Sequence, residues 1–316
     1  MYNYESYTKV KAAIEQRRQD AIAAAESRCE LVRAESEEIA EIDRELSRTG
    51  LELFRIACAG QDLAPLKARN RELQARRKQI LVSLGYSEDF TDVHYTCEKC
   101  SDTGYTNKGQ TVCSCLREAL IKESIAASGI GRLINEQSFD NFDVEWYRRS
   151  PDNYDRMRAN LAAAKNYVKN FKNKRGNLLL IGTTGTGKTH ISTAIARDLI
   201  HQGYDVLYDS AENIFSDFEQ DRFRSGYGPY EPKAEKYLRA DLLIIDDLGT
   251  ELTNQFTISC LYNLLNTRHN RGLATVISTN LTPDQLEMRY EDRISSRLIG
   301  RDTQILVFVG DDHRIG

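Results

Sequence analysis

Residues 177–189 read NLLLIGTTGTGKT, an apolar run followed by a glycine-rich loop that ends in Lys-Thr. The loop at 182–189 fits the pattern G-x-x-x-x-G-K-[ST]. Its flanks also fit, because a strand-like run precedes it and the helix-like stretch THISTAIARDLI follows. Glycines let a backbone wrap closely around phosphate oxygens, and the start of the next helix adds partial positive charge. The stretch therefore predicts a phosphate-binding loop between a strand and a helix.

Each end of this loop has an expected chemical role. Lys188 is expected to reach the β- and γ-phosphates of ATP, and the Thr189 hydroxyl to bind Mg²⁺. The residues expected to contact the nucleotide are Gly182, Thr183, Thr184, Gly185, Thr186, Gly187, Lys188, Thr189 and His190.

A second apolar run, residues 242–245, leads directly into Asp246 and Asp247. A buried strand that ends in an acid delivers a carboxylate to the metal at the carboxyl edge of a parallel sheet. Asp246 is therefore the expected magnesium ligand, and Asp247 the residue that orients or deprotonates the attacking water. Because Asp is one methylene shorter than Glu, we expect hydrolysis that is slow or depends on a partner. The competing interpretation is a buried strand with a solvated acidic end.

Short apolar strands alternate with helical patterns from about residue 151 onward. The expected strands are 177–182, 205–210, 241–247, 274–280 and 304–310. Continuous apolar strands separated by helices are typical of a parallel sheet covered on both faces. We therefore predict an α/β fold with a P-loop nucleotide-binding core.

Four of the seven cysteines crowd into one short segment: Cys97, Cys100, Cys113 and Cys115. Two tight pairs of thiolates suit a closed tetrahedral Zn²⁺ site with a structural role. The second pair, C-x-C, is tighter than the common C-x-x-C, and His94 is a possible substitute ligand. An iron–sulfur cluster and unliganded thiols are the alternatives.

The N-terminal part is helical by its pattern. Residues 6–47 contain neither Pro nor Gly, and apolar side chains recur at gaps of three, four and seven. Gly50 is expected to end this helix, and a second helix is expected from about Asp62 to Gly85. The pair predicts an antiparallel hairpin that either packs on itself or forms a partner-binding, coiled-coil-like arm.

These patterns divide the chain into four expected parts. They are a helical arm over 1–90, a zinc module over 91–118, a linker over 119–150 and an ATPase domain over 151–316.

Composition indicates a globular protein, with 41% hydrophobic and 28% charged residues among 316. The net charge of −4 gives no support for nucleic-acid binding through bulk charge, so any such contact needs a local patch. No apolar run approaches the 18 or more residues of a membrane span, and the N-terminus lacks the apolar core of a signal peptide. We expect a cytoplasmic protein that does not bind membranes.

The motifs GTTGTGKTH, LLIIDDLGTE, STN and DRISSRL together resemble those of the DnaC/DnaI-type loaders of the bacterial replicative helicase. The IstB transposition ATPases share this ATPase domain. The resemblance covers roughly residues 130–316, and the cysteine-bearing segment is similar to the N-terminal part of DnaI-like loaders. It implies an AAA+ ATPase that self-associates with ATP, binds single-stranded DNA and holds a hexameric helicase through its N-terminal part.

The resemblance also assigns roles to further residues. Asn280 stands at the sensor 1 position, where its amide would contact the γ-phosphate or the water; a turn residue is the plainer interpretation. Arg297, and after it Arg293, are the candidates for an arginine that reaches a neighbouring subunit's nucleotide. A solvated basic helix end is the alternative. Arg314 is a candidate for a sensor 2-like arginine.

Aromatic and basic residues interleave between the second and third strands of the ATPase domain, as in a stacking platform for single-stranded DNA. They are Phe215, Phe218, Arg222, Phe223, Arg224, Tyr227 and Tyr230. A packed helix followed by an ordered loop explains the same residues equally well.

Three other interpretations remain open from the sequence alone, and one of them is an inactive zinc and coiled-coil scaffold. An IstB-like helper acting with a transposase shares the ATPase core, so only its partner would distinguish it from a helicase loader. A small-molecule kinase on a P-loop fold leaves the helical N-terminal part without a role.

Overall fold

The computed structural model describes residues 3–58, 62–223 and 232–313. Its contacts divide the chain into two compact units. The first unit spans residues 9–117, and the second comprises residues 118–316 together with residues 1–8.

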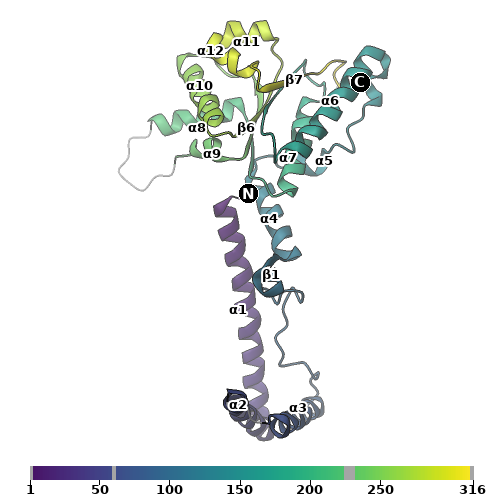
Figure 1. Cartoon of the computed structure of the whole chain (residues 1–316), viewed down its shortest axis with the longest axis vertical. Helices are drawn as coiled ribbons and strands as arrows, with labels where there is room; N and C mark the ends of the chain where they lie inside the picture. The colour runs from purple at the N-terminus through teal and green to yellow at the C-terminus, as the bar shows by residue number, and fades with distance from the viewer. Residues whose placement is uncertain (1–2, 59–61, 224–231, 314–316) are drawn as a thin grey trace. The chain divides into compact units, whose positions relative to one another are not determined.

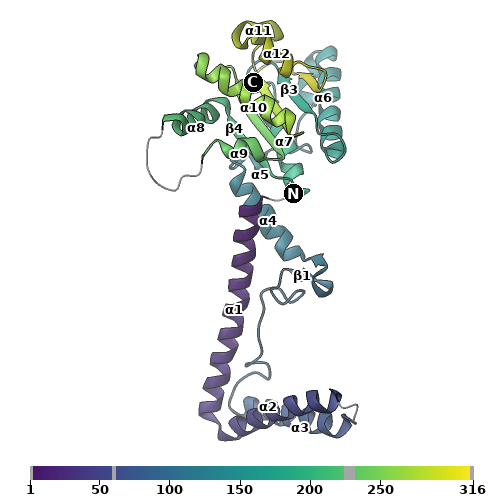
Figure 2. The ribbon, with the colours of Figure 1, turned by 60° about the vertical axis from the view of Figure 1, so that its left-hand side comes forward.

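Three helices dominate the first unit: α1 (Tyr4–Glu35), α2 (Glu37–Cys58) and α3 (Ala64–Ser83). α2 and α3 lie side by side (Figures 1 and 2). Arg69 pairs with Glu45 at 3.0 Å, and Arg76 pairs with Glu38 at 2.7 Å. The residue number rises along α3 from Arg69 to Arg76, whereas that of the partner in α2 falls from Glu45 to Glu38. The two helices therefore run antiparallel. The predicted hairpin is therefore present, but it is made by α2 and α3.

The prediction of one helix that continues to Gly50 was wrong. The helix breaks at Ser36, whose hydroxyl accepts a hydrogen bond from the Ile39 backbone N–H at 3.3 Å and so caps α2. Gly50 lies inside α2. One glycine in a helix interior costs only about 1 kcal/mol, which the packing of α2 on α3 offsets. The second predicted end was right, since α3 stops just before Gly85 in a left-handed conformation at φ +88°.

The cysteine segment folds around one buried carboxylate. Asp102 is fully buried and accepts hydrogen bonds from the backbone N–H groups of Thr96 (2.8 Å) and Cys97 (3.0 Å). From α1, Arg17 donates to the same carboxylate at 2.5 Å, and Lys11 donates to the Thr103 carbonyl at 2.6 Å. Two short strands follow, β1 (Tyr105–Thr106) and β2 (Thr111–Val112), joined by the 3₁₀ turn η1 (Asn107–Gly109). Asp102 thus fastens α1 to the cysteine segment.

The second unit is built on a five-stranded parallel sheet in the order β4-β5-β6-β3-β7. The strands are β3 (Asn177–Ile181), β4 (Val206–Ser210), β5 (Leu242–Leu248), β6 (Ala274–Thr279) and β7 (Thr303–Val307). All five predicted strands are confirmed, with shifts of one to three residues at their ends.

Helices cover both faces of this sheet (Figure 1). Leu178, Leu180 and Ile244 face one core with helices α5 (Leu133–Glu136), α6 (Pro151–Asn170) and α7 (Lys188–His201). Leu179 and Leu243 face the other, which is closed by α8 (Ala211–Phe223), α9 (Glu235–Arg239), α10 (Gln255–Asn270), α11 (Pro283–Tyr290) and α12 (Asp292–Leu298). Because successive strand residues point to opposite faces, burial on both sides explains why the strands read as unbroken apolar runs.

Residues 119–150, expected to be a linker, are mostly part of the second unit's core. The chain enters this unit through α4 (Ser114–Ala127) and continues through α5 and the 3₁₀ turn η2 (Glu145–Arg149). Ile134, Phe142 and Tyr147 are buried in the same core as α7. The aromatic side chains of this segment need apolar cover, and the face of α7 supplies it.

No helix within the described residues combines the length and the apolar composition needed to cross a bilayer.

Replacing Asp102 by Ala is expected to loosen the first unit. The change removes the acceptor for two backbone N–H groups and for Arg17, a loss of roughly 3 kcal/mol of local stability. Hydrogen exchange in peptides covering residues 9–20 and 96–103 should accelerate about a hundredfold. The matched control is Glu98→Ala, an exposed acid in the same segment. Unchanged protection in the Asp102 variant would contradict this role.

Candidate functional site

The phosphate loop leaves the end of β3 and opens α7, as its sequence predicts. Gly185 and Gly187 hold φ values of +76° and +91°, which side-chain-bearing residues rarely adopt. A Cβ on Gly187 would stand 2.8 Å from the Phe142 ring, so glycine is also required for close packing. The Lys188 ammonium is buried and donates to the carbonyls of Gly182 (2.7 Å) and Thr183 (2.8 Å). Lys188 is thus held within the loop that it would serve.

The two predicted magnesium ligands meet. The Thr189 hydroxyl, at the start of α7, donates to Asp246 Oδ2 at 3.3 Å. Two neighbouring oxygen ligands of one octahedral Mg²⁺ lie about 3 Å apart. The loop and the carboxylate at the end of β5 are therefore close enough to share one metal ion.

Two residues that the sequence did not single out fix the Asp246 carboxylate. The Tyr208 hydroxyl on β4 donates to Oδ2 at 2.6 Å, and the Ser278 hydroxyl on β6 donates to Oδ1. Burial, with the nearby Asp246 charge, raises the pKa of Tyr208 well above its usual value, so it stays a hydrogen-bond donor. Tyr208 and Ser278 lie near the ends of the two strands that flank β5, and this position is the feature of the sequence that could have indicated them.

Asp247, which Asp246 precedes, lies at an irregularity of the strand β5. The pairing of β5 with β6 is irregular between Ile245 and Leu248, and Asp247 has a left-handed φ of +54°. Such a bulge re-aims the side chains of a strand. The Asp247 N–H is held by Ser278 Oγ at 2.9 Å, and its side chain is exposed toward the pocket. The strained position is consistent with a functional residue.

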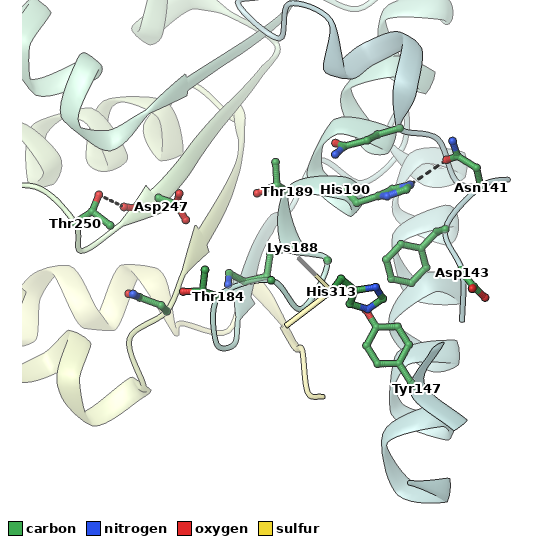
Figure 3. Close-up of a pocket in the computed structure, with 15 residues that line it drawn as sticks. Asn141, Asp143, Tyr147, Thr184, Lys188, Thr189, His190, Asp247, Thr250 and His313 are labelled. Atoms are coloured by element: carbon green, nitrogen blue, oxygen red, sulfur yellow. Dashed lines mark hydrogen bonds between the residues drawn. The ribbon is translucent and has the colours of Figure 1, made fainter. Parts of the chain in front are cut away.

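Lys188, Thr189 and Asp247 line one cavity of about 470 Å³ at the carboxyl edge of the sheet (Figure 3). Asp247 and Thr250 lie on one side, and the loop with Lys188 and Thr189 lies in the middle. Asn280 also lines the cavity. The predicted sensor Asn280 is therefore in the pocket, exposed, at the end of β6.

The other wall comes from segments that the sequence did not assign to the site. It is formed by Gln137, Asn141, Phe142, Asp143, Tyr147, His190 and His313. The Tyr147 hydroxyl donates to the Thr186 carbonyl at 2.9 Å. The rings of Phe142 and His190 pack nearly perpendicular to each other, with their centroids 5.2 Å apart. The ring nitrogen Nε2 of His190 contacts the Ser138 carbonyl at 2.9 Å. Burial lowers the pKa of His190, so its ring is neutral at pH 7.

The predicted arginines lie elsewhere. Arg293 and Arg297, on α12, line a second cavity with Asn177, Thr275 and Thr303, at the amino ends of the strands. They cannot reach the pocket at the carboxyl ends of the same sheet. Arg293 pairs with Glu291 at 3.1 Å and lies over the Tyr262 ring. Arg314 falls outside the described residues.

The aromatic–basic segment is described only in part. Phe215 is buried, and Phe218 packs against the core of the sheet. Arg222 lies over the rings of Phe223 and Phe256, and Phe223 is 69% exposed. Arg224, Tyr227 and Tyr230 fall outside the described residues. The packed-helix interpretation therefore holds for the first two aromatics.

The sequence profile of the IstB-like ATP-binding proteins matches residues 127–301, more than half of the chain. The chain belongs to this family. It is an ATP-binding protein with an AAA+ type P-loop domain, and the matched residues span the phosphate loop, Asp246 and Asn280.

Curated relatives of this IstB-like protein carry replication and phage names. It is 26% identical over 254 residues to the phage-like element PBSX protein XkdC of Bacillus subtilis, covering 75% of this chain and 90% of that protein. It is 25% identical over 198 residues to the replicative helicase loader DnaC of Escherichia coli, covering 63% of this chain and 77% of that protein. A crystal structure of the DnaC helicase loader aligns with a TM-score of 0.47 and 22% identity, over 57% of this chain and 99% of that chain.

The four cysteines of the IstB-like protein converge as a metal site requires. Their sulfur atoms all lie within 4.8 Å of one another. Cys97 and Cys113 are 3.8 Å apart, and Cys100 and Cys115 are 3.5 Å apart. Thiolates around a tetrahedral zinc ion are about 3.8 Å apart, given Zn–S bonds of about 2.3 Å. His94 is outside this cluster and contacts the Asp89 carbonyl. The donor set thus fits Zn²⁺ and leaves no open position.

Lys188→Ala is expected to abolish ATP binding, because the loop loses the charge that meets the phosphates. Calorimetric titration with ATP and Mg²⁺ should show at least a hundredfold weaker binding. Lys172→Ala, at an exposed lysine after α6, is the control and should bind as the unaltered protein does. Near-normal affinity in the Lys188 variant would place the nucleotide elsewhere.

We expect the purified protein to contain about one zinc ion per chain. Elemental analysis should show that Cys100→Ser loses the metal, whereas Cys29→Ser retains it. Bound iron in place of zinc, or zinc retained by the Cys100 variant, would overturn the assignment.

Proposed function

We propose that this IstB-like protein is an ATPase that loads the replicative DNA helicase. The observation that carries the ATPase part is the contact between the Thr189 hydroxyl and Asp246 at 3.3 Å, which supports their proposed role as the two protein ligands of one Mg²⁺. The similarity to DnaC, over 77% of that protein's length, supports the loading part.

The residues of the pocket suit hydrolysis of a bound triphosphate. Mg²⁺, when bound, would neutralise charge on the β- and γ-phosphates. Lys188 would hold the same oxygens, and Asp247 and Asn280 would position the attacking water from the opposite side. Because Asp247 has a short side chain, hydrolysis is expected to be slow until a partner adjusts the site.

A complete site needs a second copy of the chain. Arg293 and Arg297 lie at the far edge of their own sheet, so they can serve only a neighbour's nucleotide. Arg297 is half-buried, whereas Arg293 is exposed and paired with Glu291. We therefore keep Arg297 as the first candidate. This placement of the arginines supports the proposed ATP-dependent self-association.

The first unit is the proposed contact to the helicase. It provides the α2–α3 hairpin, and none of its described residues, 9–58 and 62–117, lines the nucleotide pocket. Single-stranded DNA would contact the ATPase unit near Arg222 and Phe223, where an exposed ring and a guanidinium lie together.

The family name favours one alternative, an IstB-type helper of a transposase. It would use the same pocket, so only the partner separates the two functions.

The test is affinity capture of the full-length protein from its native cell with ATP and Mg²⁺. We expect the replicative helicase to be recovered, and the Lys188→Ala variant to recover much less. Recovery of a transposase without helicase would favour the alternative and overturn the loading proposal.

The same preparations test the arginines. Light scattering should show larger assemblies with ATP, and Arg297→Ala should lower ATP hydrolysis at least tenfold without weakening ATP binding. Arg301→Ala, at an exposed arginine of the same edge, is the control. If Arg297→Ala hydrolyses ATP at the full rate and Arg293→Ala does not, Arg293 is the arginine that reaches the neighbour's nucleotide.

A further inference from the structure

Two buried polar atoms in the nucleotide pocket have no hydrogen-bond partner. Among the described residues, five buried side-chain polar atoms lack one, and two of the five, Gln137 Oε1 and His313 Nε2, line this pocket. Leaving such an atom unpaired costs about 1–3 kcal/mol, so native proteins usually pair it with protein, water or ligand. Both atoms therefore point to a ligand that supplies the missing hydrogen bonds.

The wall that carries them suits the nucleoside and not the phosphates. The loop and Asp246 place the phosphates and metal at the start of α7. Beyond them, the rings of Tyr147, His190 and His313 line the remaining wall (Figure 3). The Phe142 ring, which packs against His190, also lines the pocket. A flat, largely apolar base needs such ring faces, together with a few polar groups for its edge.

Gln137 is the side chain on this wall with an unused acceptor. Its neighbour Asn141 is engaged, because Asn141 Oδ1 accepts from the Ser138 backbone N–H at 2.8 Å and contacts His190 at 3.0 Å. An amide oxygen with no partner is suited to accept from an exocyclic amino group.

Residues 309–313, here called the strap, follow β7 and lie against the phosphate loop. The backbone N–H of His313, at the end of the strap, donates to the Gly185 carbonyl at 3.1 Å. Its ring stacks on Trp146 at 4.6 Å and lies 5.0 Å from the Tyr147 ring. Burial lowers the pKa of His313, so the ring is neutral at pH 7. A neutral ring nitrogen can donate or accept, according to the tautomer, and a hydroxyl group can pair with either form.

We propose that Gln137 and His313, on this wall of the pocket, recognise the nucleoside part of ATP. Gln137 Oε1 accepts from the 6-amino group of adenine, and His313 Nε2 pairs with a ribose hydroxyl. The strap thereby joins the nucleotide to the end of the sheet. This inference rests on the proposed ATP site and adds the residues that distinguish ATP from its analogues.

The test for Gln137 compares ATP with the purine riboside triphosphate that lacks the 6-amino group. The unaltered protein should bind ATP about fivefold more tightly, as one hydrogen bond allows. Gln137→Ala should weaken ATP binding by a similar factor and bind both nucleotides equally. Gln202→Ala, an exposed glutamine at the end of α7, is the control. A preference for ATP that survives in the Gln137 variant would overturn the assignment.

The test for His313 compares ATP with its 2′-deoxy and 3′-deoxy analogues. His313→Phe keeps a ring on Trp146 but removes the nitrogens. It should bind ATP about fivefold more weakly and lose the unaltered protein's preference over at least one deoxy analogue. His201→Phe, at an exposed histidine, is the control. If His313→Phe prefers ATP over the deoxy analogues as strongly as the unaltered protein does, the proposed role of His313 is overturned.

Thermal unfolding separates these roles from a structural one. Without nucleotide, both variants should unfold at or above the temperature of the unaltered protein, because each loses an unpaired buried atom. With ATP, both should gain less stability. A lower melting temperature without nucleotide would assign the residues to packing. If the unaltered protein binds no nucleotide, the proposed function itself fails; if it binds and the variants match it, only this inference fails.

Discussion

The Asp246 carboxylate is the contact on which the nucleotide site depends. It receives hydrogen bonds from Thr189 of α7, Tyr208 of β4 and Ser278 of β6. One side chain thus fixes the helix after the phosphate loop against three neighbouring strands. Three neutral hydroxyl donors hold this carboxylate in a fixed orientation. The register of the sheet, with Ser210 opposite Asp246, is what brings these groups to one edge.

Around this contact, the pocket is closed by chain segments that lie outside the strand–helix repeats. Residues 137–147 come before the first strand of the sheet and 309–313 after the last. Tyr147 joins them, since its hydroxyl reaches the Thr186 carbonyl and its ring lies beside His313. Both segments touch the outer side of the phosphate loop, so a change in nucleotide would be felt by each.

The first unit relies on a similar device. The buried Asp102 side chain ties the backbone at Cys97, the first of the clustered cysteines, to Arg17 of α1. A buried carboxylate is costly unless its oxygens are all engaged, and here the engaged donors come from two distant parts of the sequence. The same residues that order the cysteine segment therefore also order the long helix. In both units, one acid decides how separate segments meet.

The sequence alone determined the strands, the phosphate loop, the ends of β5 and β6, and the cysteine set. These features are local: a short run of residues carries both the backbone conformation and the chemistry. Only the tertiary structure decided that α1 ends at Ser36, that residues 119–150 belong largely to the ATPase core, and that Tyr208, Ser278, Gln137 and His313 lie at the site. It also decided that Arg293 and Arg297 face away from their own nucleotide pocket. Such facts depend on contacts between residues that are far apart in the chain, and no spacing pattern records those contacts because packing, not local conformation, creates them.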